Sequence, residues 1–112
     1  MTDEELVDGL KALAHPVRLR IMQALTGSER NVGEIDDAAD IGQPTLSQQL
    51  AVLRNAGLVK TRKEAKLVYY RIDEARIAKI VDATGALGGL AGNPMPQSRQ
   101  PAPGVANFAK LG

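Results

Sequence analysis

The sequence contains no cysteine, one histidine and three aromatic residues in 112 positions. Without cysteine there are no disulfides, thiolate metal ligands or thiol-based redox switches. One histidine, His15, is too few for most catalytic or metal-binding sites. No apolar run approaches the roughly 20 residues needed to cross a bilayer. The chain opens with acids instead of a basic signal region, so we expect a cytoplasmic protein with no membrane partner.

Charge is unevenly distributed, although the formal net charge is only +1. Residues 1–40 carry nine acids and four bases, a net of −5, whereas residues 43–72 carry six bases and one acid, a net of +5. A confined basic segment in a nearly neutral chain suits a polyanion such as nucleic acid. A charge run alone is more often a solvated face, so this interpretation depends on the pattern of helices and strands around it.

Apolar residues recur at helical spacing in four segments of the first half of the chain. Pro16 separates the first two segments and suits the first turn of the second helix. Gly27 favours a left-handed helix end, and Asn31 can cap the third helix. The predicted helices cover residues 3–14, 16–25, 32–39 and 43–56.

After Gly57 the pattern changes from helical to alternating. Residues 58–63 and 67–72 are two β-prone runs with Glu64 and Ala65 between them. Their alternation predicts a hairpin with one apolar face and one basic face. A fifth helix is predicted to begin at Asp73 and Glu74.

The order is therefore helix, helix, helix–turn–helix, hairpin, helix. This order predicts a mainly α fold with a small β-hairpin, a winged helix-turn-helix. Residues 85–112 hold six glycines and four prolines, a composition that cannot bury enough surface to offset the entropy of ordering. We expect one winged-helix domain for DNA binding and dimerisation over residues 1–85, followed by a disordered tail over residues 86–112.

The fourth predicted helix is amphipathic in a way that suits the major groove. Leu46, Leu50 and Leu53 share its inner side, and the outer side carries small or amide side chains instead of a mixture of Lys and Glu. Gln and Asn can pair with adenine edges, a Thr methyl can touch a thymine methyl, and Ser can hold a phosphate. The outer side and its flank consist of Pro44, Thr45, Ser47, Gln48, Val52, Arg54 and Asn55.

Three segments together resemble the ArsR/SmtB family of bacterial repressors. They are HPVRLRIMQAL, TLSQQLAVLRNAGLV and TRKEAKLVYYRI, and the resemblance covers about residues 5–85. Within the family, the sequence is most similar to the hemolysin, biofilm and nodulation regulators. That subgroup often has alanine, as Ala65 here, where the wing of metal sensors usually has glycine.

The resemblance implies a homodimer built from the first and last helices, with one recognition helix and one wing in each protomer. Gln49 stands where the family commonly has histidine, and the helical wheel favours a structural role for it over a base contact. Gly42 stands where the family commonly has a serine cap. The DNA-binding residues implied are Gln43, Thr45, Ser47, Gln48 and Arg54 on the recognition helix and Arg62, Lys63 and Lys66 on the wing. The dimerisation residues implied are Leu6, Leu10, Leu13, Ile77, Ile80, Val81 and Thr84.

We therefore predict a sequence-specific DNA-binding regulator, a dimeric repressor at an inverted-repeat operator, which uses no cofactor. An enzyme is disfavoured because the sequence lacks a cysteine nucleophile and a Gly-rich phosphate loop. Two alternatives remain: a winged-helix module that binds protein, and a non-specific architectural DNA binder.

The family's metal and thiol switches have no counterpart in this sequence, and we predict no metal site. Asp36, Asp37 and Asp40 could attract a hard cation weakly, but a solvated helix end explains them equally well. Release by a small organic effector, by a partner protein or by a change in concentration all remain open.

Overall fold

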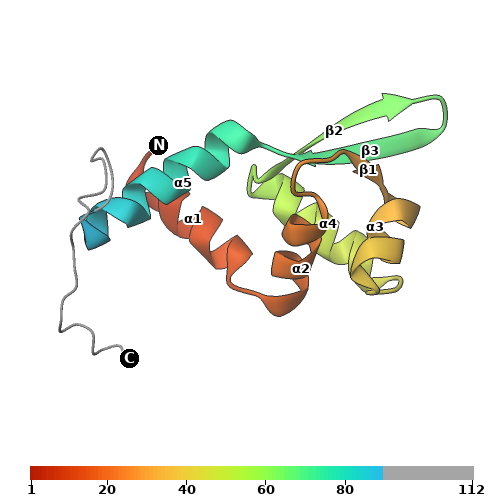
Figure 1. The fold of residues 1–112 in the computed structure, drawn as a ribbon, viewed down its shortest axis with the longest axis horizontal. Helices are drawn as coiled ribbons and strands as arrows, with labels where there is room; N and C mark the ends of the chain where they lie inside the picture. The colour runs from red at the N-terminus through yellow and green to blue at the C-terminus, as the bar shows by residue number, and fades with distance from the viewer. Residues whose placement is uncertain (90–112) are drawn as a thin grey trace. The chain divides into compact units, whose positions relative to one another are not determined.

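The structure is a computed structural model, and it describes residues 1–89. This part of the chain folds into five α-helices and a three-stranded antiparallel sheet, which confirms the predicted mainly helical winged fold (Figure 1). The helices are α1 (Asp3–Leu13), α2 (Pro16–Ala24), α3 (Val32–Ala39), α4 (Thr45–Asn55) and α5 (Glu74–Gly85), and the strands are β1 (Arg30–Asn31), β2 (Val59–Glu64) and β3 (Leu67–Ile72).

The chain divides into two compact units, residues 1–80 and residues 81–112. The first unit contains all the elements of the winged helix up to the first half of α5. The described part of the second unit is the end of α5 and a 3-10 turn, η1 (Ala86–Gly88). The disordered tail predicted for residues 86–112 falls mostly on residues 90–112, which lie outside the described residues.

Side-chain caps set the beginnings of α1 and α2. The Thr2 hydroxyl accepts a hydrogen bond from the Glu5 amide at 3.1 Å, and the Glu5 carboxylate accepts one from the Thr2 amide at 2.8 Å. At α2, Nδ1 of His15 accepts from the Val17 amide at 3.2 Å. The histidine therefore lies at the junction of α1 and α2, where it caps the second helix.

The third helix begins and ends on local polar contacts. Asn31 and Glu34 form a reciprocal capping box, with both hydrogen bonds at 2.9 Å. After α3, one Asp36 carboxylate oxygen accepts from the amides of Ile41 at 3.1 Å and Gly42 at 2.8 Å. Asp36 thus closes the turn between α3 and α4. Within residues 1–89 there is no group of three metal-ligating side chains.

The sheet contains one strand more than the sequence predicts. Strand β1 pairs with β3, and the order is β1-β3-β2. A two-residue strand is too short to produce an alternating pattern, which explains why sequence periodicity missed it. The hairpin turn also differs: Glu64 pairs with Leu67, so the turn residues are Ala65 and Lys66.

The predicted start of α4 is wrong by two residues. The helix begins at Thr45 with Pro44 as its N-cap, not at Gln43. The physical reason is that a residue before proline is disfavoured in the helical conformation. The apolar side of α4 is as predicted, because Leu46, Leu50 and Leu53 are fully buried.

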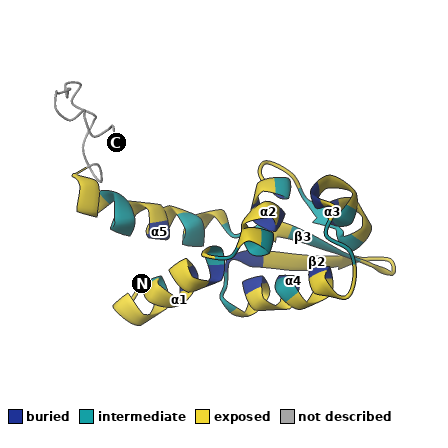
Figure 2. Cartoon of the chain, turned by 90° about the horizontal axis from the view of Figure 1, so that it is seen from below, coloured by how far each residue is buried: buried dark blue, intermediate teal, exposed yellow. Residues whose placement is uncertain are grey.

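The core lies where the helices of the first unit meet one another and the sheet, and the hairpin tip is exposed (Figure 2). Gly9 of α1 lies close to Ile80 of α5: a Cβ at Gly9 would lie 2.7 Å from Cδ1 of Ile80. The residues that are essentially inaccessible to solvent are Ile21, Leu25, Ile35, Leu46, Leu50, Leu53 and Leu58.

Candidate nucleic-acid interface

The outer face of α4 is solvent-exposed and mostly polar. Burial of the three leucines on the inner side leaves the other side of the helix to solvent. Val52 is the only large apolar residue of α4 that is exposed, at 39%. The residues that the sequence predicts for base and phosphate contact are all exposed here: Gln43, Thr45, Ser47, Gln48 and Arg54.

Gln43 also helps to begin α4. Its side-chain carbonyl accepts a hydrogen bond from the Ser47 amide at 3.1 Å, while Pro44 supplies no side-chain cap. This contact satisfies one of the amides that every helix leaves unpaired in its first turn. Gln43 thus fixes the N-terminal end of the helix whose next turn presents Thr45 and Gln48.

Gln49 faces the protein and not the outer surface of α4. It is half-buried, and its side-chain oxygen accepts a hydrogen bond from Nη1 of Arg18 at 2.9 Å. Arg18 also donates from Nε to the Ala12 carbonyl at 2.7 Å. Through Arg18, the end of α1 and the start of α2 are therefore tied to the middle of α4. This supports the predicted structural role of Gln49.

Towards its base, the hairpin has the mainly basic face and the apolar face that were predicted. Lys60 lies opposite Arg71 and Arg62 lies opposite Tyr69, so these four residues share one face. The other face carries residues that pack against the core, including Tyr70 and Ile72.

Lys63 and Lys66 are exposed near the tip of the wing. Alternation along β2 places Lys63 on the face opposite Arg62, and Lys66 lies in the turn. Within residues 1–89, neither lysine takes part in an ion pair. Both ammonium groups are therefore available to an anion.

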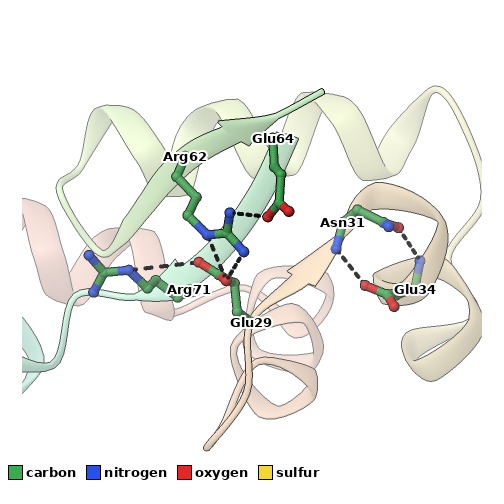
Figure 3. A network of polar contacts seen from close by, with 6 residues as sticks. All are labelled: Glu29, Asn31, Glu34, Arg62, Glu64 and Arg71. Atoms are coloured by element: carbon green, nitrogen blue, oxygen red, sulfur yellow. Dashed lines mark hydrogen bonds and ion pairs between the residues drawn. The ribbon is translucent and has the colours of Figure 1, made fainter. Parts of the chain in front are cut away.

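Arg62 differs from these lysines because two carboxylates hold it (Figure 3). Its Nη2 lies 2.7 Å from Oε1 of Glu29, its Nε donates to the same oxygen at 2.8 Å, and its Nη1 lies 2.6 Å from Oε1 of Glu64. The guanidinium also lies over the Tyr69 ring, 4.8 Å from the centroid. A second arginine, Arg71, places Nε 4.0 Å from Oε2 of Glu29.

These contacts shift the pKa values of Glu29 and Arg62. The hydrogen bond from Arg62 lowers the pKa of the Glu29 carboxyl below its ordinary value, and the charges of Arg62 and Arg71 act in the same direction. Hydrogen bonds to Glu29 and Glu64 in turn raise the pKa of Arg62. No sequence pattern points to Glu29, because it lies 33 residues from Arg62 in the acidic half of the chain.

The residues assigned to dimerisation differ in exposure. Ile80 is buried within the chain, Leu6, Leu13, Ile77 and Thr84 are half-buried, and Leu10 is 37% exposed. In the second unit, Val81 is 58% exposed. Within residues 1–89, none of the helices has the length and apolar character needed to span a membrane.

A short helix pair with an exposed polar second helix, followed at once by a basic hairpin, defines a winged helix-turn-helix fold. Residues 15–61 match the profile of a bacterial regulatory protein family, arsR. The chain is 49% identical over 79 residues to the biofilm growth-associated repressor of Xylella fastidiosa, covering 70% of this chain and 69% of that protein. It is 41% identical over 73 residues to the transcriptional activator HlyU of Vibrio cholerae, covering 65% and 68%.

A solved structure agrees with these sequence matches. The crystal structure of the transcriptional repressor BigR from Xylella fastidiosa matches with a TM-score of 0.62 and 45% identity, over 78% of this chain and 96% of that one. The chain belongs to the ArsR family of bacterial regulatory proteins. This confirms the resemblance inferred from the sequence, and the family and these relatives are transcription regulators, not enzymes.

Proposed function

We propose that this chain is a sequence-specific DNA-binding transcription regulator that acts as a dimeric repressor at an inverted-repeat operator. The observation that carries the proposal is the polar outer face of α4, flanked by a wing whose tip has free lysines. Base recognition falls to Thr45 and Gln48, with Gln43, Ser47 and Arg54 beside them. Lys63 and Lys66 contact phosphates, which position the protein on the duplex. Arg62, which the family resemblance also assigns to DNA contact, is already held by Glu29 and Glu64.

Dimerisation is proposed through α1 and the last helix, α5. The support is the family resemblance together with apolar side chains that the single chain leaves exposed. On α1 these are Val7, at 46%, and Leu10, and on α5 Val81. The proposed set is Leu6, Leu10, Leu13, Ile77, Val81 and Thr84, with Ile80 supporting this surface from the core of the protomer. A two-fold dimer would place two recognition helices on two half-sites, which is the geometry that an inverted repeat requires.

The repressor assignment follows the relative from Xylella fastidiosa, which is named a repressor. Because HlyU of Vibrio cholerae is named an activator, the sign of regulation must be measured. A switch in this chain uses no thiol chemistry, since the sequence contains no cysteine. We propose the cytoplasm as the site of action.

Selection of genomic fragments by the purified chain at about 150 mM salt tests the proposal. An enriched inverted repeat near promoters is the expected result. Absence of any enriched site from a folded protein would contradict it and favour the protein-binding module, for which Val52 would be the contact residue to test first.

A pair of glutamine variants then tests the recognition helix. Gln48→Ala should relax base preference at one step in each half-site and lose about 1–3 kcal/mol per contact on the best site. Gln23→Ala makes the same chemical change at an exposed position of α2 and should leave binding unchanged. Equal loss on every DNA sequence would show that Gln48 does not read a base.

A further inference from the structure

Arg62 forms a cluster with Glu29, Glu64, Tyr69 and Arg71, the Arg62 cluster, and this distinguishes it from the lysines of the wing. We propose that Arg62 is a positioning residue that fastens the wing to the segment before β1 through Glu29, and that it does not itself bind phosphate. The inference rests on the proposed DNA binding, because its consequence is the placement of Lys63 and Lys66.

All three nitrogens of the Arg62 guanidinium are engaged within the chain. Nε and Nη2 both contact one oxygen of Glu29, and Nη1 contacts Glu64. The Tyr69 ring lies against the guanidinium as well. The guanidinium has five N–H donors, so a phosphate could reach only those that the carboxylates leave unused, and it would meet the repulsion of both carboxylates there.

The cluster is also close to electrically neutral. Arg62 and Arg71 bring two positive charges, and Glu29 and Glu64 bring two negative charges (Figure 3). An incoming polyanion therefore finds little attraction at the Arg62 guanidinium itself, although Lys60 on the same face has no ion pair within residues 1–89. The exposed lysines near the tip have no such compensation, and they attract phosphates more strongly for that reason.

Glu29 lies where it can control the direction of the wing. It directly precedes β1, whose Arg30 and Asn31 pair with Tyr70 and Tyr69 of β3. Continued by one residue, this register places Glu29 opposite Arg71, which agrees with their ion pair. Since β1 has only two residues, the Glu29 contacts add attachment between the hairpin and the rest of the fold.

The same segment leads directly into the helix-turn-helix. Asn31 ends β1 and caps α3 through its box with Glu34 (Figure 3). A two-stranded hairpin alone is only marginally ordered. Fastening its outer strand β2 to the residue before β1 thus fixes the wing relative to the start of α3.

Substitution of Glu29 gives opposite outcomes for the two possible roles of Arg62, fastening the wing and binding phosphate. The variants are Glu29→Gln, Arg62→Gln and the double variant, measured by DNA titration across salt concentrations and by amide hydrogen exchange of β2 and β3 without DNA. A positioning role predicts that both single variants weaken binding by up to about fivefold, the range open to an exposed ion pair. The double variant should lose no more than either one, with the salt slope unchanged, and exchange should speed up in the hairpin.

Two controls make the result specific. Glu64→Gln removes an Arg62 contact within the same strand, so it should leave hairpin exchange unchanged. Lys66→Ala should reduce the salt slope by about two in a dimer, which shows that the assay detects a lost phosphate contact.

Tighter binding by Glu29→Gln together with a reduced salt slope for Arg62→Gln would overturn the inference, because freeing the guanidinium would then have helped it to bind DNA. Unchanged hairpin exchange in Glu29→Gln would overturn it too. If the wild-type chain binds no DNA at all, the proposed function fails, whereas the exchange measurement still decides whether Glu29 fastens the wing.

Discussion

Removing the donors of Arg18 should loosen the attachment of the recognition helix to the fold. Arg18→Met keeps most of the aliphatic stem but deletes the hydrogen bonds to the Ala12 carbonyl at 2.7 Å and to Gln49 at 2.9 Å. Ala12 lies in the last turn of α1, where carbonyls have no partner within the helix. A hydrogen bond from a charged donor contributes about 1.5–3 kcal/mol, and partial exposure of Arg18 reduces the sum of two. We expect a loss of about 2 kcal/mol in the free energy of unfolding.

The assay is urea unfolding followed by far-ultraviolet circular dichroism at a fixed protein concentration, since dimerisation would make stability concentration-dependent. Arg54→Met makes the same chemical change on the exposed side of α4 and should cost less than about 0.5 kcal/mol. The double variant Arg18→Met/Gln49→Ala should lose about 0.5–1.5 kcal/mol less free energy of unfolding than the two single variants together, because both remove the same hydrogen bond. If Arg18→Met costs no more than the Arg54 control, the attachment described here is not a source of stability.

Two further predictions concern the wing. Ala65 has a φ of 57°, in the left-handed region that costs an L-residue roughly 1–2 kcal/mol. Ala65→Gly should therefore stabilise the fold by about 0.5 kcal/mol, after the entropy that glycine loses on folding is subtracted. A lower midpoint of urea unfolding would contradict this. The pKa of Glu29 is lowered in the folded chain, so its contribution is fully present above the ordinary value of 4.5 and is lost as the pH falls through the folded value. An NMR titration should show the Glu29 carboxyl titrating below 4.5 and returning towards it in Arg62→Gln; an unchanged Glu29 titration would exclude Arg62 as the cause.

The elements that the sequence predicted well are those with a long, regular apolar pattern. Leu46, Leu50 and Leu53 place the recognition helix because their spacing is set by burial along a single helix. Strand β1 has no such pattern, since its two residues are held by pairing with β3. The start of α4 depended on the local restriction before Pro44, which periodicity does not register.

The exposure of the candidate site's residues could be predicted from the sequence, but the ion pairs of Arg62 could not. The exposure of Gln48 and Lys66 follows from the helical wheel and from the turn. The ion pair of Arg62 with Glu29 could not be predicted, because Glu29 belongs to a distant segment of the sequence that contacts the hairpin only in the folded chain. The count of six bases in residues 43–72 therefore overstates the charge available to a ligand, because Glu29, from the acidic half, offsets part of it.

The number of bases that are free to bind phosphate predicts how strongly operator binding depends on salt concentration. Lys63, Lys66 and Arg54 are the proposed DNA-contacting bases that have no ion pair within residues 1–89. If each neutralises one phosphate, a dimer makes six such contacts, and the plot of log affinity against log salt should have a slope of about −5. Including Arg62 in both protomers would steepen the slope to about −7. Titrations of the enriched operator between about 50 and 200 mM salt distinguish the two values. A slope near the steeper value that Arg62→Gln reduces would mean that DNA displaces Glu29 from Arg62.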